Sequence, residues 1–290
     1  MNGDDKKNAS HRLSSRLVQA AFLAIVLLLW FLATTKWGVS RILLPNPVNV
    51  WHQLVDIVAS GAFIPDLRVT LGELAAAFAI AMSLGVTIGY LISRSRYWIR
   101  VFEPLLSAIY AIPIILFLPL YVLLLGLGPA SKIALGATIS FFPIVLSTIA
   151  GFGYVDRRLL TAARSMGANN IQMFRHVLLP AALPVILAGL RLGFTVALLS
   201  VIASETIASF AGLGHHIVDL AENMDTARMF AYIAVVIAIV AFLNAVVSKI
   251  EGRARWRLPA RRPHVPPPGR PPPAFGAGSC ATLASLALAS

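Results

Sequence analysis

Residues that could carry out catalysis are sparse in this sequence and do not form a recognisable set. The chain has no Ser-His-Asp arrangement, no GxxxxGK(S/T) phosphate loop and no HExxH zinc motif. His215 and His216 are adjacent, but no further ligand stands at metal-binding spacing, so a solvated loop is favoured over a metal site. We therefore expect no catalytic residue, no metal and no cofactor on this chain.

The polar stretch that could bind a partner covers residues 154–180. Ala162, Ala163 and Met166 fall on one small apolar face of a short helix, predicted over residues 158–166. Such a face could dock in a groove of another protein. A generic amphipathic helix that rests on lipid headgroups explains the same pattern, and periodicity alone does not separate the two.

The rest of this segment predicts a turn and a second short element. Gly167 suits the end of the first helix. The apolar residues that then recur at helical spacing are Ile171, Phe174 and Leu178. Pro180 and Pro184 are expected to restart the backbone at the next apolar run.

The composition of the whole chain indicates the environment in which this segment is held. Of the 290 residues, 58% are hydrophobic and 12% are charged, and the mean hydropathy is +0.80. A soluble domain carries about 25% charged residues. So few charges cannot cover a water-soluble surface, and the long continuous apolar runs indicate membrane-spanning helices rather than a β-barrel. The fold class is therefore predicted as an all-α membrane protein.

Six apolar runs approach the ~20 residues that cross a bilayer. They divide the chain into a tail at 1–16, a transmembrane domain at 17–250 and a basic, Pro-rich tail at 251–290 that is expected to be disordered. The predicted spans are 17–33, 69–92, 101–125, 133–151, 181–203 and 230–247.

The net charge of +12 could suggest nucleic-acid binding, but the basic residues gather at the ends of alternate apolar runs. Lys and Arg collect in cytoplasmic loops of membrane proteins. This asymmetry places both termini and the segment at 154–180 in the cytoplasm, and it excludes nucleic acid as the expected partner.

Three residues within or beside the spans could border a transport pathway or act in gating. Pro113 and Pro119 interrupt the third span, which indicates helix distortion and is also typical of helices along a pathway. Glu205 ends the fifth span, where it could line the pathway, pair with a partner subunit or serve as a helix-end charge at the outer interface.

A resemblance resolves the role of the polar segment. The spacing Ala162-Ala163-x3-Gly167, followed after nine residues by Val177-x-Leu179-Pro180, resembles the signature loop of permease subunits of bacterial binding-protein-dependent ABC importers. In that family the loop begins Glu-Ala-Ala and forms a coupling helix that fits a cleft on the ATP-binding subunit. Thr161 stands where the family has glutamate. The resemblance implies an ATPase-coupling loop made of Thr161, Ala162, Ala163, Arg164, Met166, Gly167, Ile171, Phe174, Leu179 and Pro180.

The resemblance covers about residues 44–249 and extends to the nitrate, sulfonate and taurine branch. The matching motifs are Leu44-Pro45-Asn46-Pro47-x3-Trp51, Ala111-Ile112-Pro113, Gly126-Leu127-Gly128, Phe141-Phe142-Pro143 and Ser204-Glu205 with Gly212-Leu213-Gly214. It implies the type I ABC importer permease fold and a small anionic cargo such as a sulfonate, taurine or nitrate.

The same resemblance implies the partners and the compartment. The partners are two cytoplasmic ATP-binding subunits that hold ATP and Mg, a second permease copy in a homodimer, and a periplasmic or lipid-anchored substrate-binding protein. The compartment is the bacterial inner membrane. The alternative is an ion-driven secondary transporter, which is disfavoured because such proteins carry ionisable residues at mid-membrane and these spans have almost none.

Overall fold

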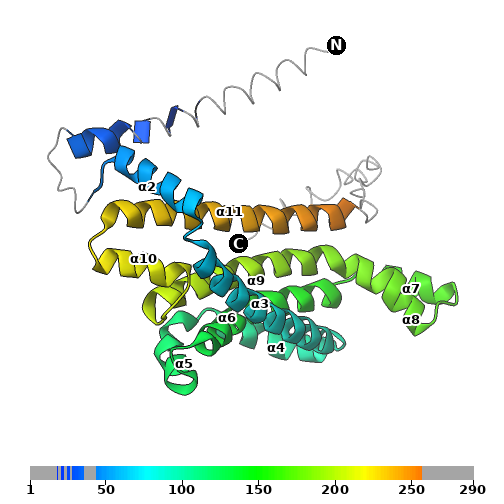
Figure 1. Ribbon diagram of the computed structural model, residues 1–290. Coiled ribbons are helices and arrows are strands. Elements are labelled where there is room, and N and C mark those ends of the chain that lie inside the picture. Colours follow the sequence, from blue (N-terminus) through cyan, green and yellow to red (C-terminus); the bar gives the residue numbers. More distant parts are fainter. Residues whose placement is uncertain (1–17, 19–20, 23–24, 27, 36–43, 257–290) are drawn as a thin grey trace, which may run out of the picture. The chain divides into compact units, whose positions relative to one another are not determined.

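The computed structural model describes residues 18, 21–22, 25–26, 28–35 and 44–256, and every element between Pro47 and Trp256 is helical. The elements are α2 (Pro47–Ser60), α3 (Ile64–Ser93), α4 (Arg96–Tyr110), η1 (Ile114–Phe117), α5 (Leu118–Leu125), α6 (Pro129–Gly153), α7 (Arg157–Ser165), α8 (Asn170–Met173), η2 (Phe174–Leu178), α9 (Leu179–Ile207), α10 (Leu213–Glu222) and α11 (Thr226–Trp256) (Figure 1). The predicted all-α fold is confirmed.

Within the described residues, four helices are long and apolar enough to cross a membrane. They are Ile64–Ser93, Pro129–Gly153, Asn170–Ile207 and Thr226–Gly252. They contain the predicted second, fourth, fifth and sixth spans, and each extends beyond its predicted bounds. The predicted tail at 1–16 lies outside the described residues. Of the predicted first span at 17–33, residues 18, 21–22, 25–26 and 28–33 are described, and they are helical.

The last helix ends later than predicted. α11 continues to Trp256, past the predicted end of the transmembrane domain at residue 250. The charged residues that follow the apolar run are good helix formers, and Glu251 Oε2 lies 3.3 Å from Arg191 Nη1 of α9. The predicted tail therefore begins with helix, and its remainder beyond Trp256 lies outside the described residues.

The helix of the predicted third span at 101–125 is broken, which agrees with the distortion expected at Pro113 and Pro119. The chain forms α4, a short 3-10 turn and α5, and the two arms meet at an angle of 71°. Pro113 lies at the break and Pro119 in the first turn of α5. A proline removes an N–H donor and its ring clashes with the preceding turn, so the helix restarts rather than continues. If this bent pair is counted as one crossing, the described spans number five.

The core of the bundle is α6, which packs between α3 and α9. Two glycine pairs, each four residues apart, bring these helices close to α6: Gly85 and Gly89 on α3, and Gly189 and Gly193 on α9. A Cβ added to Gly89 would lie 2.6 Å from Thr148 Cβ, and one added to Gly193 would lie 2.6 Å from Ile144 Cγ1. Small residues at this spacing allow close helix packing in lipid, where no hydrophobic effect drives helices together.

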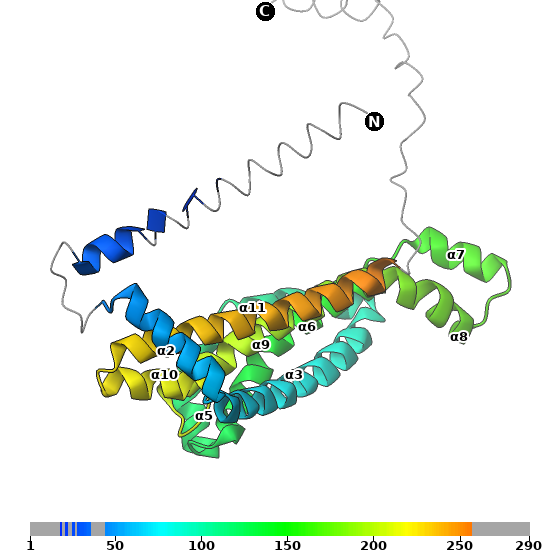
Figure 2. The same cartoon turned by 45° about the horizontal axis from the view of Figure 1, so that its top comes forward.

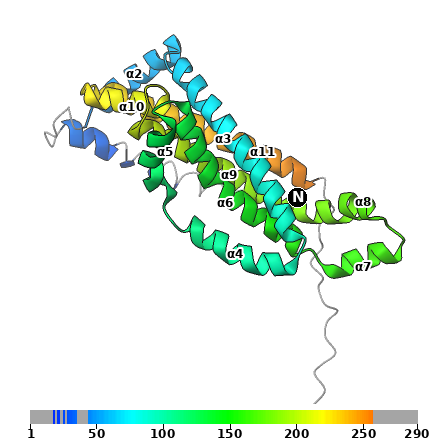
Figure 3. The same ribbon diagram turned by 90° about the horizontal axis from the view of Figure 1, so that it is seen from below.

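The two ends of the bundle carry different elements. α7 and α8 project from one end, whereas α2, α5 and α10 lie at the other, as Figures 2 and 3 show. At that second end, α2, α10 and α11 share a hydrophobic cluster around the buried Ile57, Leu213 and Tyr232. His215 and His216 belong to α10 and are partly buried, so the predicted solvated loop is wrong.

Candidate functional site

The candidate partner-binding segment begins with the short helix that the sequence predicts. α7 starts after Asp156, whose Oδ1 accepts a hydrogen bond from the backbone N–H of Arg158 at 2.9 Å. This is an N-cap, which satisfies one of the free donors at a helix start. Just before it, Tyr154 donates its hydroxyl to Glu103 Oε2 at 3.0 Å, and this hydrogen bond raises the pKa of the Tyr154 phenol.

α7 ends in a turn that requires a left-handed residue. Gly167 has φ +79°. Its N–H bonds the carbonyl of Arg164 at 2.9 Å, and the N–H of Ala168 bonds the carbonyl of Ala163 at 3.1 Å. These two bonds form a Schellman motif, which commonly ends helices at glycine. The expectation that Gly167 ends the helix is confirmed.

The exposed surface of this segment differs from the predicted face. Ala163 is only 3% exposed, so it packs inside the chain and cannot belong to an open face with Ala162 and Met166. The helical period puts Ala162, Ala163 and Met166 on one side of the helix. It does not show which of them packs against the rest of the chain. The apolar residues that are exposed, here named the apolar tip, are Leu159, Ala162, Met166 and Ile171. Met166 and Ile171 are 81% and 77% exposed.

The second element joins the next span without a break. Asn169 and Gln172 form a capping box, and the chain stays helical from Asn170 to Ile207. The expectation that Pro180 and Pro184 restart the backbone is therefore wrong. A π turn at Phe174–Leu178 precedes Pro180 and widens the helix where the proline ring would otherwise meet the preceding turn.

Several residues of the predicted coupling loop hold the segment to the bundle rather than forming its tip. The Phe174 ring lies 5.5 Å from Tyr90 and 6.2 Å from Phe152, measured between ring centroids. Leu179 and Pro180 are partly buried at the start of α9, whereas the side chains of Thr161 and Arg164 are exposed on α7. A coupling role for these residues stays a prediction.

At the opposite end, the bundle encloses a polar cluster, here named the outer cluster, around Glu205, which is only 1% exposed. Thr70 Oγ1 donates to Glu205 Oε1 at 2.7 Å, and the backbone N–H of Gly214 donates to Glu205 Oε2 at 2.8 Å. The N–H of Leu213 in turn donates to Thr70 Oγ1 at 3.0 Å. Glu205 thus ties α9 to α3 and to the start of α10, and its predicted pathway role stays a prediction.

A buried ion pair completes the outer cluster. Glu73 Oε1 lies 2.9 Å from Lys132 Nζ, and Lys132 Nζ also donates to Ser209 Oγ at 2.6 Å. Neither Glu73 nor Lys132 is predicted from the sequence to have a role, because hydropathy places both near the ends of spans, where charged residues are ordinary. The available signal was the spacing of Thr70 and Glu73, which puts two polar groups on the same helix face as the buried Ala77.

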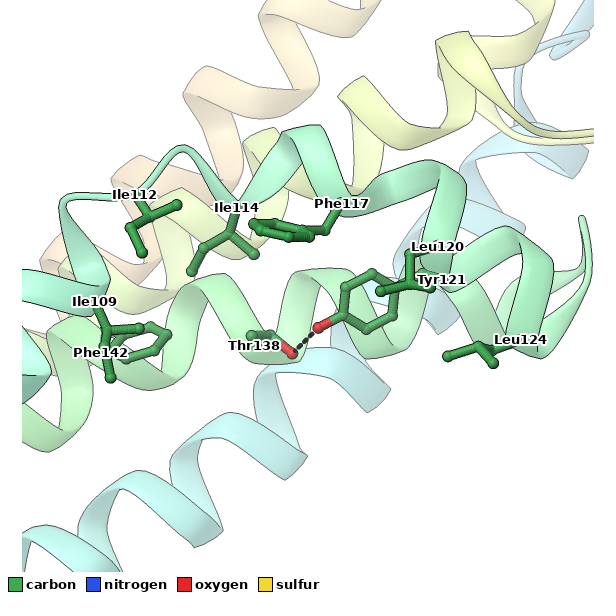
Figure 4. A pocket seen from close by; sticks show the side chains of 9 residues that line it. All are labelled: Ile109, Ile112, Ile114, Phe117, Leu120, Tyr121, Leu124, Thr138 and Phe142. Atoms are coloured by element: carbon green, nitrogen blue, oxygen red, sulfur yellow. Dashed lines mark hydrogen bonds between the residues drawn. The ribbon is translucent and has the colours of Figure 1, made fainter.

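The prolines of the broken span border an apolar groove, shown in Figure 4. The groove has a volume of about 410 Å³ and is lined by residues on α4, η1, α5 and α6 and in the turn between α4 and η1, including Ile112, Phe117 and Phe142. Its polar contact joins the Tyr121 hydroxyl to Thr138 Oγ1 at 2.9 Å. Pro113 and Pro119 adjoin the groove without lining it, and their gating role stays a prediction.

Gly167 offers a direct test of the segment's geometry. Replacing it with valine should speed amide hydrogen exchange across residues 163–168 about five- to tenfold, since a non-glycine residue at positive φ costs roughly 1 kcal/mol or more. A Cβ at this position would meet no atom within 4 Å, so the change acts through the backbone alone. Gly167→Asn is the control, because asparagine tolerates this conformation. Equal exchange in both variants would contradict the role of the turn.

Comparisons with known proteins agree with the helical membrane fold described above. A model of the family described as "Binding-protein-dependent transport system inner membrane component" matches residues 81–256. The taurine transport system permease protein TauC of Escherichia coli K12 is 34% identical over 226 residues, covering 76% of this chain and 82% of that protein. The putative aliphatic sulfonates transport permease protein SsuC of Bacillus subtilis 168 is 30% identical over 235 residues, covering 81% and 85%.

Solved structures resemble the fold. An amino acid ABC transporter crystallised with histidines has 25% identity and a TM-score of 0.56, over 71% of this chain and 98% of that one. The inward-facing MetNI methionine ABC transporter has 18% identity and a TM-score of 0.56, over 66% and 95%. Both matches support the predicted type I permease fold.

Proposed function

Because the chain belongs to the family of binding-protein-dependent inner-membrane permeases of ABC importers, we propose that it imports a small organic anion such as taurine or another sulfonate and that residues 154–180 couple it to an ATP-binding subunit. Membership favours ATP-driven import over the ion-driven alternative. Support for the cargo comes from the two relatives named for taurine and aliphatic sulfonates.

The observation that carries the coupling proposal is the apolar tip. Met166, at the end of α7, and Ile171, on α8, are large apolar residues with most of their surface exposed. Both helices project from one end of the bundle (Figure 2). An amphipathic helix that presents such residues is suited to an apolar groove on a partner. The basic residues of the same segment, Arg158, Arg164 and Arg175, support a cytoplasmic location for this end, where ATP is available.

The importer proposed here has further subunits. Two ATP-binding subunits hold ATP and Mg, a second copy of this permease completes the channel, and a substrate-binding protein delivers the cargo from outside. This chain contributes no catalytic group. It transmits movement because each of its conformations makes different contacts with the partners.

The test uses the assembled importer and a matched pair of exposed methionines. Met166→Asp should reduce co-purification of the ATP-binding subunit at least about tenfold and abolish taurine uptake, because an unpaired carboxylate in an apolar interface costs more than ~1.4 kcal/mol. Met224→Asp is the control: Met224 is 70% exposed and lies between α10 and α11, at the opposite end. Retention of the ATP-binding subunit by both variants would contradict the coupling proposal.

The transported substrate is identified by uptake measurements on the same preparation. Uptake of taurine or an alkanesulfonate by the unmodified importer supports the anion. One relative at 30% identity is named for riboflavin transport, so riboflavin is the informative competitor. Uptake of riboflavin without taurine uptake would contradict the proposed cargo and leave the coupling result intact.

A further inference from the structure

A second hollow lies beside the coupling segment, and nothing in the transport cycle described above uses it. It has a volume of about 320 Å³ and is bounded by the turn between α3 and α4, the end of α6, α7 and η2. Its polar lining residues are Ser93, Arg94 and Arg96. The apolar part of its wall includes Tyr90, Phe152 and Leu178. The hollow therefore combines charged and apolar lining residues.

The charge of the two arginines is not balanced by an ion pair within the part of the chain that the structure describes. Among the described residues, no carboxylate forms an ion pair with Arg94 or Arg96. The acidic groups of the neighbouring elements are already engaged: Glu103 accepts from Tyr154, and Asp156 caps α7. Two uncompensated guanidinium groups at one opening attract an anion, and the planar guanidinium suits the oxygens of a phosphate.

The depth of the hollow indicates where that phosphate comes from. The spans α3 and α6 end at Ser93 and Gly153, which both adjoin the hollow. A bilayer that these helices cross would therefore place the hollow at its polar boundary. Phospholipid phosphates occupy that boundary, and anionic lipids attract basic groups there. A free phosphate ion would gain nothing from the aromatic and aliphatic wall, whereas the glycerol and upper acyl carbons of a lipid can pack against it.

We propose that this hollow binds the headgroup of an anionic phospholipid, with its phosphate held by Arg94 and Arg96 and its apolar part against Tyr90 and Phe152. The same wall supports the coupling segment, because Phe174 at the start of η2 packs on Tyr90 and Phe152, and Leu160 of α7 lines the hollow. A bound lipid thereby steadies α7 and η2. The binding itself does not depend on the proposed function, but any effect on ATP-driven uptake does.

The test measures lipid retention by the full chain without its partners. The protein is reconstituted in nanodiscs of phosphatidylcholine mixed with phosphatidylglycerol, extracted, and analysed by native mass spectrometry. Arg94→Gln combined with Arg96→Gln should lower the retention of phosphatidylglycerol at least tenfold and leave phosphatidylcholine unchanged. The matched control combines Arg68→Gln with Arg228→Gln, which removes two exposed arginines from the opposite end of the bundle.

Each outcome decides the proposal. Loss of phosphatidylglycerol in the first double variant and its retention in the control support it. Equal retention in both overturns it. In a parallel thermal-shift measurement, stabilisation by inorganic phosphate equal to that by short-chain phosphatidylglycerol would overturn the lipid assignment in favour of a free-phosphate site. Because no ATP-binding subunit is present, failure here leaves the proposed function untouched, and failure of the coupling test leaves this result untouched.

Discussion

Replacing Lys132 with methionine is expected to destabilise the folded protein by about 3–5 kcal/mol, the usual cost of removing one partner from a buried ion pair. Glu73 and Lys132 are 3% and 2% exposed, so water cannot solvate the remaining carboxylate. The substitution also removes the hydrogen bond to Ser209. The expected readout is a lower unfolding temperature of the purified protein in detergent.

A double-mutant cycle separates this effect from simple loss of packing. Glu73→Gln combined with Lys132→Met leaves no unpaired charge and should recover much of the stability that Lys132→Met loses. The cycle therefore predicts a strongly favourable coupling between the two positions. Additive losses would mean that the ion pair does not hold α3 against α6.

Gly89→Leu is expected to prevent assembly of the bundle. A Cβ at Gly89 would lie 2.6 Å from Thr148 Cβ and 2.9 Å from the carbonyl oxygen of Val145, and neither atom is the mobile end of a side chain. Overpacking of a close interface costs about 1–3 kcal/mol, and more when backbone must move. The measured result should be the loss of monodisperse, protease-resistant protein after extraction from the membrane.

The control for this prediction lies on the same helix. A Cβ at Gly72 would meet no atom within 4 Å, and the residue is exposed on α3. Gly72→Leu should therefore give parental yield, because leucine favours helix more than glycine does. Normal yield from Gly89→Leu would contradict the close packing of α3 on α6.

The membrane spans could be predicted from the sequence because a long run of apolar residues directly indicates a helix surrounded by lipid. The second span predicted at 69–92 lies within Ile64–Ser93, and the fourth at 133–151 within Pro129–Gly153. α7 was also predictable, since Gly167 marks its end through local chemistry. Averages of hydropathy do not register a bend, however. Pro113 and Pro119 indicated a distortion of the third span, but not that its two arms meet at 71°.

The features that could not be predicted are contacts between residues on different helices of the bundle. Periodicity places Ala162 and Ala163 on one stripe, but only the packed structure shows that Ala163 turns inward. Glu73 and Lys132 are far apart in sequence and stand on different helices, α3 and α6, so no local pattern pairs them. The π turn before Pro180 is similar: a proline usually predicts a helix start, and the wider turn that accommodates it has no simple sequence signature.

The unbroken helix from Asn170 to Ile207 has a mechanical consequence. Its 38 residues span roughly 57 Å at about 1.5 Å per residue. Its tightest contacts with α6, at Gly189 and Gly193, lie near its midpoint. We infer that this helix acts as a lever between its two ends: a push on Asn170 loads the hydrogen bonds that hold Glu205 to α3 and α10.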